Sequence, residues 1–255
     1  MINYIKKRFF VKNLSETETN QLVLEKIGHQ IYTGPFAGLK IPTIVQKEFK
    51  LAESLGLYEF ALHKVISTLP SRKIDNIMVI GGHKGYYPAG LSNFLRPENM
   101  YVFEMDEKFF PFLESWISLN NLKPYKFYQE ATAEILEKWN EKIDFLLIDC
   151  EGAEDFLLLP DQYPWQKNTD ILVEVHHFYD NKIMGNLISR FKNTHQLEII
   201  YDDIMENHII DTILKELGIK GNYRKQPLHR WIFNENKSKI ITSGVFLYMK
   251  ANSKS

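Results

Sequence analysis

A loop rich in glycine follows the first segment of the chain that has the character of a buried strand. The apolar run at residues 77–80 leads directly into Gly81, Gly82 and Gly85. Glycines at the end of a strand let the backbone turn sharply and approach a ligand closely. Glu104 ends the next apolar run, where it is placed to accept hydrogen bonds from ribose hydroxyls. Together these features predict a site for an adenosyl cofactor, with a purely structural role of the glycines as the alternative.

The spacing of these glycines distinguishes between adenosyl cofactors. A dinucleotide site prefers the pattern Gly-x-Gly-x-x-Gly, which this loop does not offer in register. The sequence also has no Gly-x-x-x-x-Gly-Lys-Ser/Thr run of the kind that cradles nucleotide phosphates. A hydride-transfer enzyme that uses NAD(P) is therefore only the second choice for such a site.

Acidic residues and a histidine follow two later apolar runs. Asp149 and Glu151 come after residues 143–148, and Glu174 and His176 lie at the end of the next run. Ligands of open α/β sheets bind outside the carboxyl ends of the strands. We therefore expect the two groups to face one crevice, although they lie far apart in the sequence.

Three interpretations of this acidic group stay open. A hydroxyl that accepts a methyl group loses a proton, and His176 is the first candidate for the base because an unperturbed histidine titrates at about pH 6.5. Asp149, Glu174 and His176 could instead hold a divalent cation such as Mg²⁺, which would acidify a bound hydroxyl. In the structural interpretation, Asp149 and Glu151 cap the following helix. His177 would point to the opposite face of a strand, so we do not expect it to act together with His176.

The elements that must position these residues alternate between strand and helix. The capping-box spacing of Ser15 and Glu18 predicts a helix to about Ile27, and further helices are expected at 58–69, from the glycine loop to Pro97, and at 109–119. Apolar runs predict strands at residues 77–80, 100–103, 125–128, 143–148, 171–175, 197–201 and 245–249. This alternation is typical of an α/β protein with a doubly wound, mostly parallel sheet.

Composition and charge restrict the class of protein. The 255 residues are 44% hydrophobic and 25% charged, which suits one globular α/β domain with extensions. No apolar run approaches about 18 residues, so no stable membrane insertion is expected. The net charge of −1 gives no general attraction to nucleic acid, and the single cysteine, Cys150, is typical of a reducing compartment. We predict a cytoplasmic protein with no nucleic-acid partner and leave its oligomeric state open.

Three separated motifs stand in order along the chain. They are Gly85-Tyr86-Tyr87 after the first strand, Ile148-Asp149-Cys150-Glu151-Gly152-Ala153-Glu154 after the fourth, and Val173-Glu174-Val175-His176 at the fifth. With these motifs, roughly residues 57–201 resemble the FkbM-type S-adenosylmethionine-dependent methyltransferases. The resemblance implies a Rossmann-like class I methyltransferase fold, a seven-stranded sheet with an antiparallel last strand, and methyl transfer to a hydroxyl of a small molecule or glycan.

The predicted site residues follow from these motifs and from the strand ends. The residues expected to hold the cofactor are Glu59, Gly81, Gly82, His83, Gly85, Tyr86, Tyr87, Glu104, Met105, Glu130, Ala131 and Asp149. Asp149, Glu174 and His176 are the predicted catalytic residues and the possible metal ligands. The family usually carries an acid at the position of Val79, and Glu59 is the residue that could supply the missing charge. Lys84 is unexpected beside a sulfonium cation unless its side chain points to solvent.

The domain prediction separates an N-terminal helical or lid extension, residues 1–56, from a Rossmann-like domain, residues 57–255, with an insertion at about 202–241. Residues 220–231 interleave basic and aromatic side chains that could bind an acceptor or form a solvated loop. Residues 32–38 could form the opposite wall of the crevice. The leading function is O-methylation, and the alternatives are a non-catalytic adenosyl-binding protein with a degenerate motif and an NAD(P)-dependent oxidoreductase.

Overall fold

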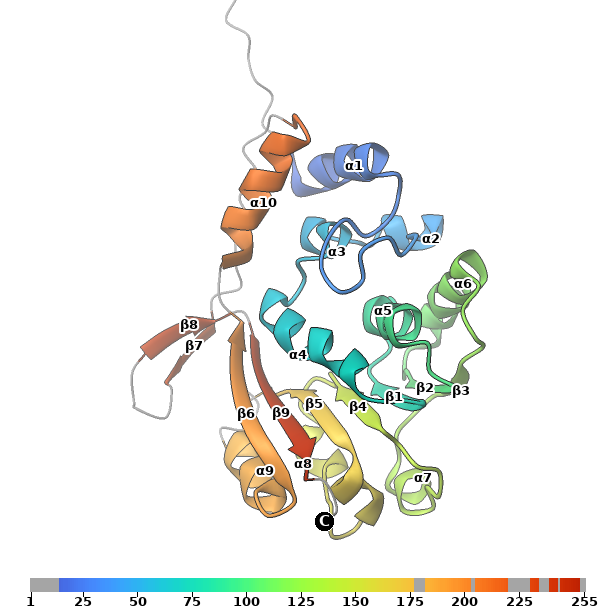
Figure 1. The fold of residues 1–255 in the computed structure, drawn as a ribbon, viewed down its shortest axis with the longest axis vertical. Coiled ribbons are helices and arrows are strands. Elements are labelled where there is room, and N and C mark those ends of the chain that lie inside the picture. The colour runs from blue at the N-terminus through green and yellow to red at the C-terminus, as the bar shows by residue number, and fades with distance from the viewer. Residues whose placement is uncertain are drawn as a thin grey trace, which may run out of the picture.

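A seven-stranded sheet forms the centre of the computed structural model, which describes residues 14–176, 182–202, 205–219, 230–233, 239–242 and 244–252. The strand order is β3-β2-β1-β4-β5-β9-β6 (Figure 1). The bounds are Asn76–Ile80 for β1, Asn99–Phe103 for β2, Lys126–Tyr128 for β3, Phe145–Ile148 for β4, Asp170–Glu174 for β5, His195–Asp202 for β6 and Gly244–Ala251 for β9. Strands β1 to β5 pair in parallel, whereas β9 lies antiparallel between β5 and β6. The predicted strands and the antiparallel last strand are confirmed.

Both faces of this sheet are covered, which explains why its strands are continuously apolar. On β1, Ile77 and Val79 contribute to one buried cluster, and Met78 and Ile80 contribute to the other. Helices on opposite sides of the sheet complete the two clusters (Figure 1). The first side holds α4 (His63–Thr68), α5 (Tyr86–Leu95) and α6 (Phe110–Asn120), and the second holds α7 (Ala133–Glu137), α8 (Glu154–Leu157) and α9 (Ile183–Phe191).

The described part of the N-terminal extension is helical and packs onto the first face. It contains α1 (Glu16–Ile27), α2 (Thr43–Gln46) and α3 (Leu51–Leu55). Helix α1 begins with the predicted capping box, in which the Glu18 amide donates to Ser15 Oγ and the Ser15 amide donates to Glu18 Oε2. The predicted helix over residues 58–69 is split into a 3₁₀ turn (Phe60–Leu62), α4, and a second 3₁₀ turn (Leu69–Ser71) that contains Pro70.

The predicted insertion contains one helix and a hairpin among its described residues. Helix α10 (Met205–Glu216) packs against α3 beside α1, so the insertion meets the N-terminal extension (Figure 1). Strands β7 (Arg230–Phe233) and β8 (Lys239–Thr242) form the antiparallel hairpin, which the sequence analysis did not predict. Most of the basic-aromatic segment, residues 220–229, and His177 lie outside the described residues. Within the described ranges, none of the helices has the length and apolarity needed to span a bilayer.

Candidate functional site

A cavity of about 630 Å³ opens at the carboxyl ends of β1, β2, β3 and β4. We call it the strand-end cavity. Residues from four strand-to-helix loops line it, and seven of the predicted cofactor residues are among them: Gly81, His83, Glu104, Met105, Glu130, Ala131 and Asp149. The fold therefore brings together residues that lie as much as 68 positions apart (149 − 81) in one chain. Ligands of open α/β sheets bind at this edge.

The first loop passes directly over the end of β4. The amides of Gly81 and Gly82 both donate to the carbonyl of Phe103, at 3.0 Å each. Gly81 has φ +97°, and a β-carbon there would lie 1.8 Å from the carbonyl oxygen of Asp149. Only glycine fits this crossing. The loop thus requires a glycine for packing as well as for any approach of a ligand.

Glu104 is fixed at the end of β2 by two backbone amides. The His83 amide donates to its Oε2 at 2.6 Å, and the Asp106 amide donates to its Oε1 at 2.8 Å. These bonds hold the carboxylate at the wall of the cavity, where its remaining lone pairs can accept hydrogen bonds from a diol. This geometry fits the predicted contact with ribose.

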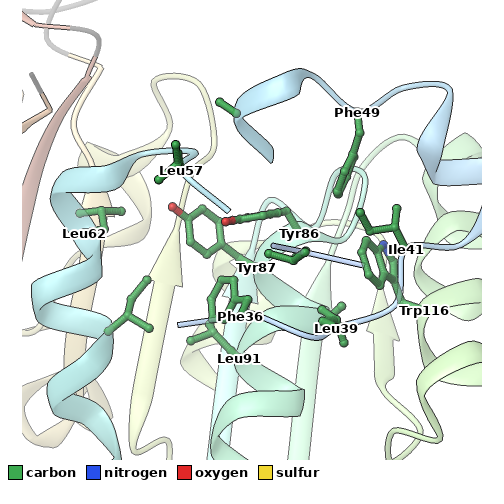
Figure 2. Close-up of a cluster of buried hydrophobic side chains, with 14 of the residues drawn as sticks. Phe36, Leu39, Ile41, Phe49, Leu57, Leu62, Tyr86, Tyr87, Leu91 and Trp116 are labelled. Carbon is green, nitrogen blue, oxygen red and sulfur yellow. The ribbon is translucent and has the colours of Figure 1, made fainter. Parts of the chain in front are cut away.

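Five of the predicted cofactor residues do not line the strand-end cavity, and four of these lie in the glycine loop or at the start of α5. Gly82 and Gly85 pack against Val102 and Trp116, so tightly that a β-carbon would lie 2.7 and 2.6 Å from those side chains. Tyr86 and Tyr87 are buried in an aromatic cluster with Phe36, between the extension and α5 (Figure 2). The Gly-Tyr-Tyr motif therefore fixes the loop by packing into the core and does not line the cavity.

Glu59 also lies outside the strand-end cavity but adjoins it through Asp149. It is buried, has the left-handed φ of +48° that non-glycine residues rarely adopt, and accepts a hydrogen bond from the Tyr87 hydroxyl. One carboxylate oxygen each from Glu59, Asp149 and Glu174 lies within 4.8 Å of the others. Burial, with the charge of Asp149, raises the pKa of Glu59 to about 8. This carboxyl group is therefore largely protonated unless a cation accompanies it.

His176 is buried behind Asp149 among carboxylates. Its Nδ1 lies 2.5 Å from Oε1 of the fully buried Glu154, and its Nε2 lies 3.4 Å from Glu151 and 3.7 Å from Asp149. Burial lowers the pKa of His176, but the hydrogen bond to Glu154 and the charges of Glu174, Glu154 and Asp149 outweigh it, so the pKa is raised. Glu154 is the first residue of α8, and the sequence offered no signal that it contacts this ring.

The charges around the strand-end cavity are of one sign. The carboxylates of Glu104, Glu130, Asp149 and Glu151 line it, and no lysine or arginine does so within the described ranges. Burial and the nearby Lys84 hold the pKa of His83 below its ordinary value, which favours a neutral ring. Burial raises the pKa of Asp149, against the opposing charge of His176. Such a cavity favours a ligand that carries positive charge.

The fold shows where Lys84 and Val79 lie, the two residues that were unexpected at their positions in the sequence. The expectation that Lys84 points to solvent is wrong, because its side chain is buried against the extension, where its Nζ lies 2.9 Å from Glu53 Oε1 and pairs with that charge. Val79 is fully buried on the face of the sheet that the extension covers, and it pairs in register with Leu147 on β4. Leu147 and Glu59 line the same very small cavity. Glu59 therefore lies on the same side of the sheet as Val79.

The topology and the site define a class of fold. An order of β3-β2-β1-β4-β5-β9-β6, with β9 antiparallel between its neighbours, is that of the Rossmann-like class I methyltransferases. The predicted fold class is confirmed. No protein-family model and no curated protein matches the sequence, so the resemblance to the FkbM family stays a prediction.

Comparison with solved structures finds similar chains of methyl-transferring proteins. An rRNA methylase from Streptococcus thermophilus aligns with a TM-score of 0.49 and 10% identity over 75% of this chain and 96% of its own. A ribosomal protein L11 methylase from Lactobacillus delbrueckii subsp. bulgaricus aligns with 0.47 and 7% over 75% and 77%. A precorrin-6y C5,15-methyltransferase from Geobacter metallireducens aligns with 0.46 and 11% over 74% and 89%. The acceptors named for these proteins differ, and none is carried over to this chain.

Proposed function

We propose that this chain is an S-adenosylmethionine-dependent methyltransferase. The observation that carries the proposal is the strand-end cavity. It joins a glycine loop and a ribose-type acid to a lining that contains carboxylates but, among the described residues, no lysine or arginine. S-adenosylmethionine supplies a methyl group on a positively charged sulfonium. The pyrophosphate of NAD(P) would instead place negative charge among Glu104, Glu130, Asp149 and Glu151, which disfavours the oxidoreductase alternative.

The lining residues divide into parts that suit different portions of this cofactor. Glu104 is proposed to accept hydrogen bonds from the ribose hydroxyls. Met105 and Ala131 offer apolar surface in the same cavity for the adenine ring. Asp149, backed by Glu59 and Glu174, supplies the negative charge that complements the sulfonium and the amino group.

We propose a hydroxyl of a small molecule or glycan as the acceptor, with the Asp149–His176 pair taking its proton. Of the three predicted catalytic residues, Asp149 lines the strand-end cavity, and His176 lies 3.7 Å behind it. A base within hydrogen-bond reach of the hydroxyl is what this transfer requires of the protein. The acidic lining also disfavours a nucleic-acid acceptor, because it would repel phosphates.

A divalent cation is the second way in which this cluster could activate a hydroxyl. The groups Asp149–Glu151–His176 and Glu59–Asp149–Glu174 each bring three ligand atoms within 4.8 Å of one another. Oxygen ligands suit Mg²⁺, and the hydrogen bond of His176 Nδ1 to Glu154 would leave Nε2 to face such an ion. Dependence of methyl transfer on Mg²⁺, abolished by a chelator, would favour this arrangement over a direct base.

The test is calorimetric titration of the purified chain with S-adenosylmethionine and with NAD⁺, each with and without Mg²⁺. We expect micromolar binding of the methyl donor and none of NAD⁺. Glu104→Gln should weaken binding about tenfold or more, since it removes a charge-assisted hydrogen bond. Glu114→Gln, on the exposed surface of α6, is the matched control and should bind like the wild type. Absence of binding by the wild type would overturn the proposal, and binding without transfer to any acceptor would favour the non-catalytic alternative.

A further inference from the structure

Lys84 lies in the middle of the glycine loop, and both its main chain and its side chain are held by residues outside that loop. Its carbonyl oxygen accepts a hydrogen bond from Trp116 Nε1 at 2.9 Å. Its side chain runs over the ring of Phe49, 5.7 Å from Nζ to the centroid, and reaches the N-terminal extension. There, Nζ lies 2.9 Å from Glu53 Oε1 and donates to the carbonyl of Glu48 at 3.0 Å. Lys84 therefore fixes a short loop to two separate elements.

The partner of Lys84 is itself held in place. Glu53 is buried on α3, and its Oε2 accepts a hydrogen bond from the amide of Lys50, the residue before this helix, at 2.6 Å. The Glu53 and Lys84 side chains are only 6% and 11% exposed, so neither charge has an alternative partner in bulk water. Loss of one member would leave the other charge buried and unpaired, at a cost far above that of a surface ion pair.

The residues on either side of Lys84 have the backbone conformation that most needs such support. His83 lines the strand-end cavity with a φ of +40°, which is rare for a residue with a side chain, and its amide binds Glu104. Gly85 has a φ of +90° and packs against the ring of Trp116. Strained backbone persists only where the surrounding structure determines it. The anchored Lys84 lies between these two residues.

From this geometry we propose that Glu53 and Lys84 are positioning residues, through which the N-terminal extension holds the glycine loop in its ligand-binding conformation. The inference rests on the proposed function, since it assigns the ion pair to the affinity for S-adenosylmethionine. It makes the extension a working part of the cofactor site, although Glu53 and Lys84 do not line the cavity. Without the pair, the loop would be ordered only part of the time, and apparent affinity would fall by that fraction.

The test compares two double variants with the full wild-type chain. Glu53→Gln with Lys84→Met removes the buried pair but keeps an acceptor for the Lys50 amide. Glu98→Gln with Lys123→Met removes an exposed ion pair of 2.7 Å and is the matched control. Two readouts are taken: the dissociation constant for S-adenosylmethionine, and hydrogen exchange of the amides of residues 81–87 in the absence of ligand.

We expect the buried-pair variant to bind S-adenosylmethionine about tenfold more weakly, because its loop would adopt the binding conformation only about a tenth of the time. We also expect the amides of its loop to exchange faster. The control should match the wild type in both readouts. Unchanged exchange at residues 81–87 would overturn the inference, whatever the affinity of the variant. Faster exchange together with an unchanged affinity would also overturn it. A wild-type chain that does not bind the methyl donor overturns the proposed function instead, and the exchange data then still decide whether the pair holds the loop. If the buried-pair variant does not fold, Glu53→Gln with Lys84→Gln, which also leaves no buried charge unpaired, replaces it with the same readouts.

Discussion

Gly81 crosses the end of β4 so closely that a β-carbon on it would lie 1.8 Å from the carbonyl oxygen of Asp149. This contact joins the glycine loop after β1 to the acidic motif after β4. Asp149 is at the same time a wall of the strand-end cavity and a member of the buried carboxylate group with Glu59 and Glu174. The backbone contact therefore fixes the position of the acid relative to the loop.

Gly81→Ala should lower the free energy of unfolding by more than an alanine with a left-handed backbone conformation usually does. Gly38→Ala is the matched control, because Gly38 has a φ of +84° and open space where its β-carbon would lie. The control should lose about 1–2 kcal/mol of unfolding free energy and keep its ligand affinity. Gly81→Ala should lose more, because the crossing at Asp149 has to open, and should no longer bind S-adenosylmethionine. Urea unfolding and calorimetry measure both quantities, and equal losses in the two variants would contradict the role of the crossing.

The stability of the wild type should depend on the protonation of Glu59. Its pKa is about 8 in the folded chain and about 4.3 when unfolded, so the folded state binds the proton more tightly. The stability that this proton contributes is present below the unfolded pKa and is lost as the pH rises through 8. Glu59→Gln mimics the protonated form, so its unfolding free energy should rise relative to that of the wild type between about pH 4 and about pH 9, an interval that contains both pKa values. Urea unfolding at several pH values decides this, and a constant difference would contradict the raised pKa.

Glu154→Gln should lower the pKa of His176. The carboxylate lies 2.5 Å from Nδ1 and helps to raise this pKa, so an uncharged amide removes part of the effect. His176 stabilises the wild type most below its unfolded pKa of about 6.5, and this contribution is lost as the pH rises through the higher folded value. The stability difference between wild type and variant should therefore shrink with rising pH.

Titration of the ring signals by NMR measures the pKa of His176 directly in both proteins. Burial lowers the pKa of His195, whose ring bonds to the carbonyl of Thr169 and not to Glu154, so this pKa serves as the internal control and should be the same in both proteins. A His176 pKa that stays the same in Glu154→Gln would show that Glu154 does not hold the protonated ring.

Much of the fold was predictable because its signals are local. Each apolar run that leads into a loop became a strand, and the Ser15–Glu18 capping box begins α1 as expected. The predicted acids at strand ends also converge, since parallel strands direct their carboxyl ends to one edge. The β7–β8 hairpin was not predicted, because its strands of four residues each, Arg230–Phe233 and Lys239–Thr242, are too short to show a clear period.

The sequence by itself determined the alternation of strands and helices, the positions of the glycine loop and of the acids, and hence the edge of the sheet that carries the candidate site. Only the tertiary structure decided which of those residues meet. Tyr86 and Tyr87 turn into the core, Glu154 reaches His176, and Lys84 finds Glu53 across 31 positions (84 − 53) of the chain. The physical reason is that periodicity and turn chemistry act within a few residues, whereas buried ion pairs and close backbone crossings depend on how distant elements pack.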